Sequence, residues 1–151
     1  MPQSLAQVYL HIVFSTKNRQ PCFRDTSFSC ELCAYLAGVC KNQNCLAKTI
    51  GGSIDHVHLL CSLSRRKTIA DLIRDMKTGS SAWIKTQKPE WRNFHRQDGY
   101  GVFSVSQSQL EKVEEYINHQ NEHHQMMTFQ DEFRKLLKKH GVDFDKKYVW
   151  D

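Results

Sequence analysis

Two histidines separated by one residue, His56 and His58, are the first candidates for chemistry in this sequence. Gly51 and Gly52 precede them as a turn, and the residues that follow alternate in a way that predicts a β-strand. Successive side chains of a strand point to opposite faces, so both imidazoles lie on one face. Imidazole is the commonest metal ligand in proteins, and the pair is therefore either half of a metal site or a polar pair on a solvated strand face.

A phenol and an amide four residues apart, Tyr116 and Gln120, form a second candidate group. The apolar spacing of this stretch predicts a helix, on which residues four apart lie on the same face. Together with the strand histidines, the pair completes a candidate catalytic set. The metal ligands would be His56, His58 and Gln120. The nucleophile would be Tyr116, one helical turn from the metal.

The elements that must position these groups follow the order β-α-β-β-α-β, with two more helices after the last strand. This order predicts the ferredoxin-like or RNA-recognition-like α+β fold, a mostly antiparallel sheet with two helices on one face. The other face, or an added helix upon it, is left for function. One of the added helices carries Tyr116. Strands are expected over Leu5–Phe14, Cys45–Gly52, the His56 stretch and Tyr100–Val105, and helices over 27–42, 68–84, 106 to about 127, and 129–140.

Local signals predict where several of these elements begin and end. Thr68 can cap the second helix, and Ser106 followed three residues later by Gln109 has the pattern of a capping box. Gly141 is placed to end the last helix. In the first strand, the even positions, which include Leu10, are expected to form the core face.

Length and composition limit the classes of protein to which this sequence can belong. The 151 residues, 40% of them hydrophobic, suit one folded domain spanning 1–151. No apolar run approaches the roughly 20 residues of a membrane helix, and Met1–Leu10 lacks a secretory signal, so we expect a cytoplasmic protein without membrane contact. The net charge of +5 makes an anionic partner plausible.

The six cysteines are expected to be reduced thiols, because the chain shows no export signal. Cys30 and Cys33 have the spacing of half a zinc site, but a second pair at this spacing is absent, Cys40 and Cys45 being further apart. Buried thiols are therefore the favoured interpretation.

A run of three cations, Arg65, Arg66 and Lys67, follows the histidine strand. Such a run is often a solvated surface, but its place directly beyond the histidine strand favours phosphate binding near that strand. The stretch between Arg92 and Arg96 is an alternative basic region for nucleic acid.

These motifs resemble those of the single-tyrosine HUH transposases of small bacterial insertion sequences and of their REP-associated relatives. His56-Val57-His58 resembles the histidine-hydrophobic-histidine motif of that family, and the stretches 99–106 and 116–120 resemble its strand and tyrosine-helix signature. The resemblance covers nearly the whole chain, and both motifs occur in the family's order.

The resemblance implies a transposase that cleaves single-stranded DNA near a hairpin and rejoins it. Tyr116 would attack a phosphodiester, giving a 5′-phosphotyrosine link and a free 3′-hydroxyl. A phenol with an ordinary pKa of about 10 is a poor nucleophile at neutral pH, and the magnesium or manganese ion used by similar proteins offsets this. The family also implies a homodimer with shared active sites, although close REP-associated relatives work as monomers.

Three other functions remain open at this point. The protein could be a domesticated relative whose substrate is a repeated chromosomal hairpin, or another HUH nuclease such as a replication initiator or relaxase. It could also be a non-catalytic module that binds single-stranded nucleic acid through the RNA-recognition fold. That last class stacks bases on aromatic residues of its central strands, and the histidine strand has none between Ile54 and Leu63.

Overall fold

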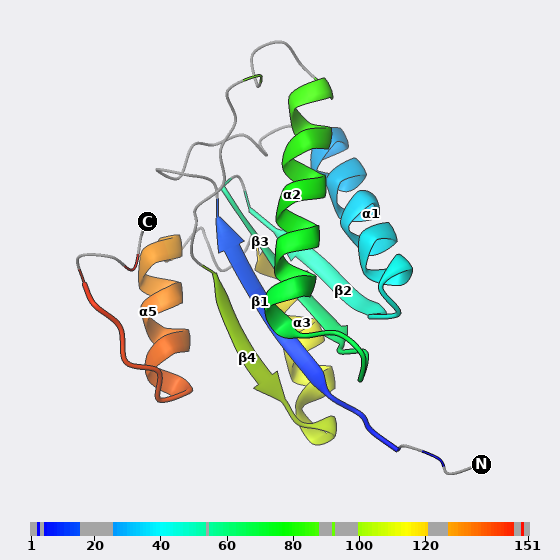
Figure 1. Ribbon diagram of the computed structural model, residues 1–151. Helices are drawn as coiled ribbons and strands as arrows, with labels where there is room; N and C mark the ends of the chain where they lie inside the picture. Colours follow the sequence, from blue (N-terminus) through cyan, green and yellow to red (C-terminus); the bar gives the residue numbers. More distant parts are fainter. Residues whose placement is uncertain are drawn as a thin grey trace.

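The computed structural model describes residues 3, 5–15, 26–53, 55–87, 92, 100–120, 127–146 and 149. The predicted order of elements is confirmed (Figure 1). The elements are β1 (Tyr9–Ser15), α1 (Thr26–Asn42), β2 (Ala47–Gly52), β3 (His56–Ser62), α2 (Ile69–Gln87), β4 (Gly101–Val105), the short 3-10 helix η3 (Gln107–Gln109), α3 (Leu110–Asn118) and α5 (Phe129–Lys139).

The four strands form one antiparallel sheet in the order β2-β3-β1-β4. The histidine strand β3 is therefore central, with β2 on one side and β1 on the other. In this register His58 lies opposite Gly51 of β2 and Val13 of β1. The sheet and its helices form the α+β fold that the sequence predicts.

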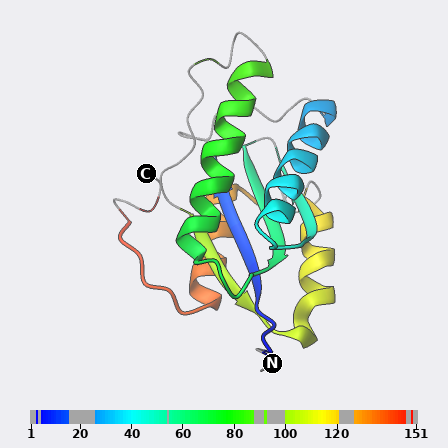
Figure 2. The same ribbon diagram turned by 45° about the vertical axis from the view of Figure 1, so that its right-hand side comes forward.

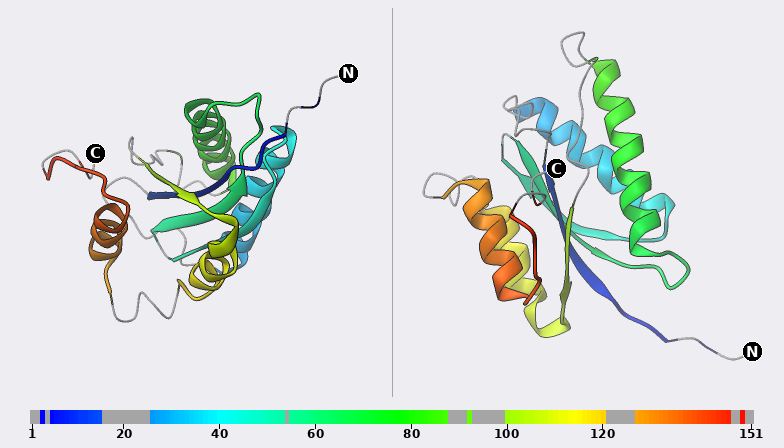
Figure 3. Two further views of the ribbon diagram at one scale, coloured as in Figure 1. Left: turned by 90° about the horizontal axis from the view of Figure 1, so that it is seen from below. Right: turned by 60° about the vertical axis from the view of Figure 1, so that its left-hand side comes forward.

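Helices cover both faces of the sheet (Figures 2 and 3). Helices α1 and α2 pack on the face formed by the even positions of β1, as predicted from the first strand. Helices α3 and α5 cover the opposite face, where Val13, Phe103 and Leu60 pack against their apolar side chains. Both faces of β1 and β3 are therefore buried, and the histidine side lies beneath α3 and α5.

Two predicted helix caps are confirmed and one is wrong. The Thr68 hydroxyl accepts a hydrogen bond from the Asp71 N–H at 3.0 Å, and Gly141 follows α5 with a φ of +66°. Ser106 makes no side-chain cap within the described part of the chain; its hydroxyl lies 3.1 Å from that of Ser108, and η3 starts this segment instead. The helix ends at Asn118, and the extension expected to about residue 127 lies mostly outside the described residues.

None of the helices in the described ranges combines the length and the apolar character that a membrane span requires. The five described cysteines are free, and Cys40, Cys45 and Cys61 are buried.

A glycine permits the close approach of α3 to the sheet. A β-carbon built on Gly51 would lie 2.7 Å from the backbone oxygen of Ile117, a distance that real side chains do not tolerate. Ile117 directly follows Tyr116, so the space at Gly51 helps to set the position of the candidate nucleophile.

We predict that Gly51→Ala lowers the free energy of unfolding by about 1–3 kcal/mol, because a backbone group cannot move aside as a flexible side chain can. Urea unfolding measures this change. Gly38→Ala in α1 is the matched control: nothing lies within 4 Å of its added carbon, and alanine favours a helix over glycine, so stability should be kept or increased. A Gly51→Ala protein as stable as the wild type would contradict the packing described here.

Candidate active site

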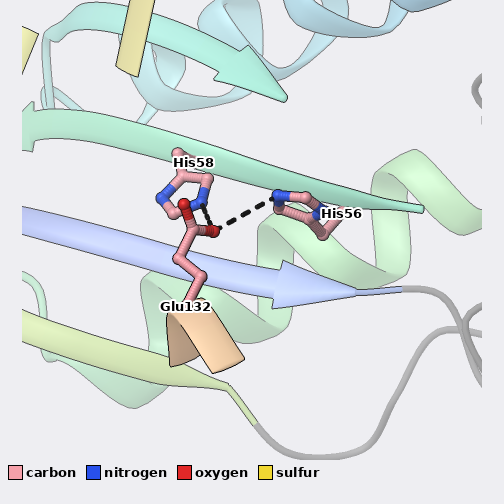
Figure 4. A group of neighbouring side chains, drawn as sticks. All are labelled: His56, His58 and Glu132. Carbon is pink, nitrogen blue, oxygen red and sulfur yellow. Dashed lines mark hydrogen bonds and ion pairs between the residues drawn. The ribbon is translucent and has the colours of Figure 1, made fainter. Parts of the chain in front are cut away.

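The two histidines of β3 lie side by side on one face of the strand, as its pattern predicts (Figure 4). Both side chains are fully buried, and their ring centroids are 5.2 Å apart. The ring of Phe129 from α5 stacks on His56 with a centroid distance of 4.4 Å. The alternative interpretation, a polar pair on a solvated strand face, is therefore wrong.

Each imidazole is held through its Nδ1 atom. His56 donates from Nδ1 to Asp55, with a distance of 2.8 Å, and the Nδ1 atom of His58 lies 2.8 Å from Nε2 of His11 on β1. A partner on one ring nitrogen fixes the ring orientation and leaves the other nitrogen for a ligand. The Nε2 atoms of both histidines consequently face the same space.

That space contains the carboxylate of Glu132, which the sequence analysis missed. Its Oε1 atom lies 2.8 Å from Nε2 of His58 and 3.5 Å from Nε2 of His56 (Figure 4). The side chain is only 2% exposed. One signal could have identified it: Glu132 falls on the apolar stripe of α5, between Phe129 and Phe133, where an acidic residue needs a buried partner.

Helix α3 and the residues just after it bring Tyr116 and Gln120 to the same space as Glu132. The hydroxyl of Tyr116 donates a hydrogen bond to Oε2 of Glu132. The side-chain oxygen of Gln120 lies 3.3 Å from Nε2 of His56, and its amide nitrogen donates to the backbone oxygen of Tyr116 at 3.3 Å. All four residues that the sequence selected for the catalytic and metal roles therefore converge, and Glu132 contacts three of them, His56, His58 and Tyr116.

Burial and charge perturb the titration of these groups. Burial, the nearby charge of Glu132 and the hydrogen bond to it raise the pKa of Tyr116 well above its usual value, while a hydrogen bond from Gln120 acts in the opposite direction. Burial, with His58 as a further cause, lowers the pKa of His11 to about 3, so this ring is neutral at physiological pH. Burial also lowers the pKa of His56, but the bonds to Asp55 and Glu132 outweigh it and raise the pKa overall.

The donor atoms fit a divalent metal ion. One nitrogen from each of His56 and His58 and one oxygen from Glu132 lie within 4.8 Å of one another, and all three residues are buried. The Gln120 oxygen adds a neutral donor beside His56. A mixed set of imidazole and oxygen donors suits divalent transition metals, and its oxygen donors suit harder cations as well. The fixed Nδ1 atoms supply the outer hydrogen bonds that metal-bound histidines need.

The basic run does not share this site. Arg65, Arg66 and Lys67 follow the end of β3, whereas His56 begins it, so the strand separates them by about 20 Å at 3.3 Å per residue. Lys67 forms an ion pair with Asp75 at 3.6 Å. The three cations lie between the end of β3 and the start of α2, as the sequence predicts, and their role in DNA binding stays a prediction. Of the alternative region 92–96, only Arg92 is among the described residues.

Known structures share this architecture. A proposed transposase of Deinococcus radiodurans R1 superposes with a TM-score of 0.62 at 20% sequence identity, covering 80% of this chain and 95% of that one. A REP-associated tyrosine transposase bound to a REP hairpin gives a TM-score of 0.57 at 11% identity, covering 79% and 70% respectively. At these identities the similarity shows the fold. No curated protein matches the sequence.

The sequence itself identifies the family. Residues 4–120 match the family described as "Transposase IS200 like", and this range contains both histidines, Tyr116 and Gln120. The match spans most of the chain, so this protein belongs to the IS200-like transposase family.

Proposed function

We propose that this transposase cleaves and rejoins single-stranded DNA through Tyr116, using a magnesium or manganese ion held by His56, His58, Glu132 and Gln120. One observation carries the proposal: the hydroxyl of Tyr116 and the Nε2 atom of His58 contact the two oxygens of the same carboxylate. A nucleophile and a set of metal donors are thus in direct contact, as metal-assisted attack on a phosphodiester requires. Membership of a transposase family supports this chemistry.

The residues around the proposed metal site have different roles in this reaction. Asp55 and His11 hold the two histidine rings so that Nε2 of each faces the site. Gln120 holds its oxygen beside His56 and also bonds the backbone of Tyr116. When bound, a divalent ion supplies a Lewis acid that stabilises the charge on the reacting phosphoryl group. Burial of these side chains limits access of water that would compete with Tyr116.

The substrate is proposed to be a single strand that carries a hairpin. The structural neighbour that was solved with a REP hairpin supports this choice. Arg65, Arg66 and Lys67 would then contact phosphates at the far end of β3 from the histidines, away from the phosphodiester that reacts. Whether the hairpin ends belong to a mobile element or to a chromosomal repeat depends on the DNA that flanks the gene.

The contacts described here support a site assembled within one chain. Tyr116, Gln120, Glu132 and both histidines belong to the same polypeptide and touch one another. We still expect a homodimer from the family resemblance, but this arrangement does not require exchange of the tyrosine helix between subunits.

A non-catalytic module with the RNA-recognition fold is disfavoured. In that fold, the sheet face opposite its two helices stacks bases on aromatic residues. Here α3 and α5 cover that face, and its central residues are buried histidines.

We predict that Tyr116→Phe abolishes the covalent protein–DNA adduct while leaving DNA affinity nearly unchanged, because only the nucleophilic oxygen is removed. The wild type and the variant are incubated with hairpin-bearing single strands and Mn²⁺, and adducts are resolved by denaturing electrophoresis. Tyr100→Phe is the matched control, since Tyr100 precedes β4 with its side chain 43% exposed. An adduct that persists in the Tyr116 variant would assign the nucleophile to another residue.

A second prediction concerns Asp55, which contacts His56 but is not among the proposed ligands. Asp55→Asn should weaken Mn²⁺ binding by roughly 10–100-fold, the usual effect of losing a partner that orients a metal ligand. Gln120→Ala should weaken it too, because a donor is lost. Calorimetric titration of the DNA-free protein measures both, with the exposed Asp131→Asn as the control. Unchanged affinity in the Asp55 and Gln120 variants would exclude this donor set.

A further inference from the structure

The carboxylate of Glu132 has two oxygen atoms with different neighbours. Oε1 faces the Nε2 atoms of the histidines, and Oε2 accepts the hydrogen bond of the Tyr116 hydroxyl. Glu132 lies on α5, beyond the residues 4–120 that match the family. We propose that Glu132 is a catalytic residue that takes the proton from Tyr116 as the phenol attacks DNA; this inference rests on the proposed function, because it assigns a role within the same site.

The position of this carboxylate is fixed by packing. Phe129 stacks on His56 at 4.4 Å and on Phe133 at 5.6 Å, which holds the first turns of α5 against the site. Gly101 leaves room for the ring of Phe133, since a β-carbon there would lie 2.5 Å from it. Thr128 caps the helix by accepting from the Asp131 N–H at 3.2 Å. A side chain on such a helix keeps the hydrogen bond that proton transfer requires.

The hydrogen-bond geometry identifies Oε2 of Glu132 as the acceptor. The residue lies in the first turn of α5, where the positive end of the helix dipole stabilises an anion. An ionised carboxylate only accepts hydrogen bonds, so the phenol must be the donor in its contact with Oε2. The neighbouring Gln120 amide cannot take this proton, because an amide group is not a base at neutral pH.

In the proposed step, every proton and electron pair is accounted for both in cleavage and in rejoining. As the bond from Tyr116 oxygen to phosphorus forms, the phenol proton passes to Oε2 of Glu132, and the bond from phosphorus to the 3′-oxygen breaks with its electron pair on that oxygen. Solvent water protonates the departing oxygen to the 3′-hydroxyl. In rejoining, the attacking 3′-hydroxyl returns its proton to solvent, and Glu132 gives its proton back to the departing Tyr116 oxygen. Strand transfer thus ends with both residues in their starting states.

The test is Glu132→Gln, which keeps the size of the side chain and an oxygen near the histidines but removes the proton acceptor. Adduct formation is followed in single turnovers at saturating DNA and saturating Mn²⁺, so that weaker binding of either does not contribute. We expect a loss of about 10²–10⁴-fold in rate, the usual contribution of a general base, and a similar loss in resealing of the isolated adduct. Glu115→Gln, an exposed position beside Tyr116, should leave both rates unchanged.

A second measurement separates proton transfer from metal binding or folding. Incorporation of 3,5-difluorotyrosine at position 116 makes the phenol more acidic, so it depends less on a base. We expect this change to restore much of the adduct rate in Glu132→Gln. Glu132→Asp retains a carboxylate and should keep part of the wild-type rate. This variant replaces Glu132→Gln in the test if the glutamine variant does not fold.

Three results would overturn the inference. A wild-type rate in Glu132→Gln would show that the proton leaves by another route, and a faster rate would show that Glu132 blocks the site. A slow variant that difluorotyrosine does not restore would assign Glu132 to metal binding or structure alone. Failure of the wild-type chain to form any adduct is a separate outcome, which would contradict the proposed function itself and this inference with it.

Discussion

The burial of two imidazole rings beneath α3 and α5 is the constraint on which this structure depends. A buried polar ring is stable only when its nitrogen atoms have partners, because an unpaired polar group inside a protein is costly. Asp55 and His11 are the partners of the Nδ1 atoms of His56 and His58, and Gln120 and Glu132 are the partners of their Nε2 atoms. Three other segments of the chain, β1, α5 and the residues just after α3, are thereby drawn to one point on β3.

The packing of β3 fixes the geometry of the groups that are proposed to carry the chemistry. The face of β3 that carries Val57 and Leu59 packs against α1 and α2 in the main hydrophobic core, which makes the strand rigid. The face that carries the histidines therefore holds them in a fixed geometry, as a metal site requires. Gly51 and Gly101 allow α3 and α5 to approach the other side closely enough for Tyr116 and Glu132 to meet.

The sequence predicts those parts of the site that depend on local spacing. The period of a strand pairs His56 with His58, and the period of a helix pairs Tyr116 with Gln120. Glu132 was missed because its contact with His58 spans 74 positions and depends on how α5 folds back. His11 was missed because the odd positions of β1 gave no sign that their face is covered. The basic run was correctly predicted to follow β3, because this position depends only on the order of elements along the chain.

The most direct test of this account is to identify the residue that becomes linked to DNA. The wild-type protein is trapped on a hairpin-bearing single strand with Mn²⁺ and digested with nuclease and protease, and the modified peptide is sequenced by mass spectrometry. We expect a nucleotide attached through its 5′-phosphate to Tyr116. A nucleotide on any other side chain, or linked through a 3′-phosphate, would contradict it.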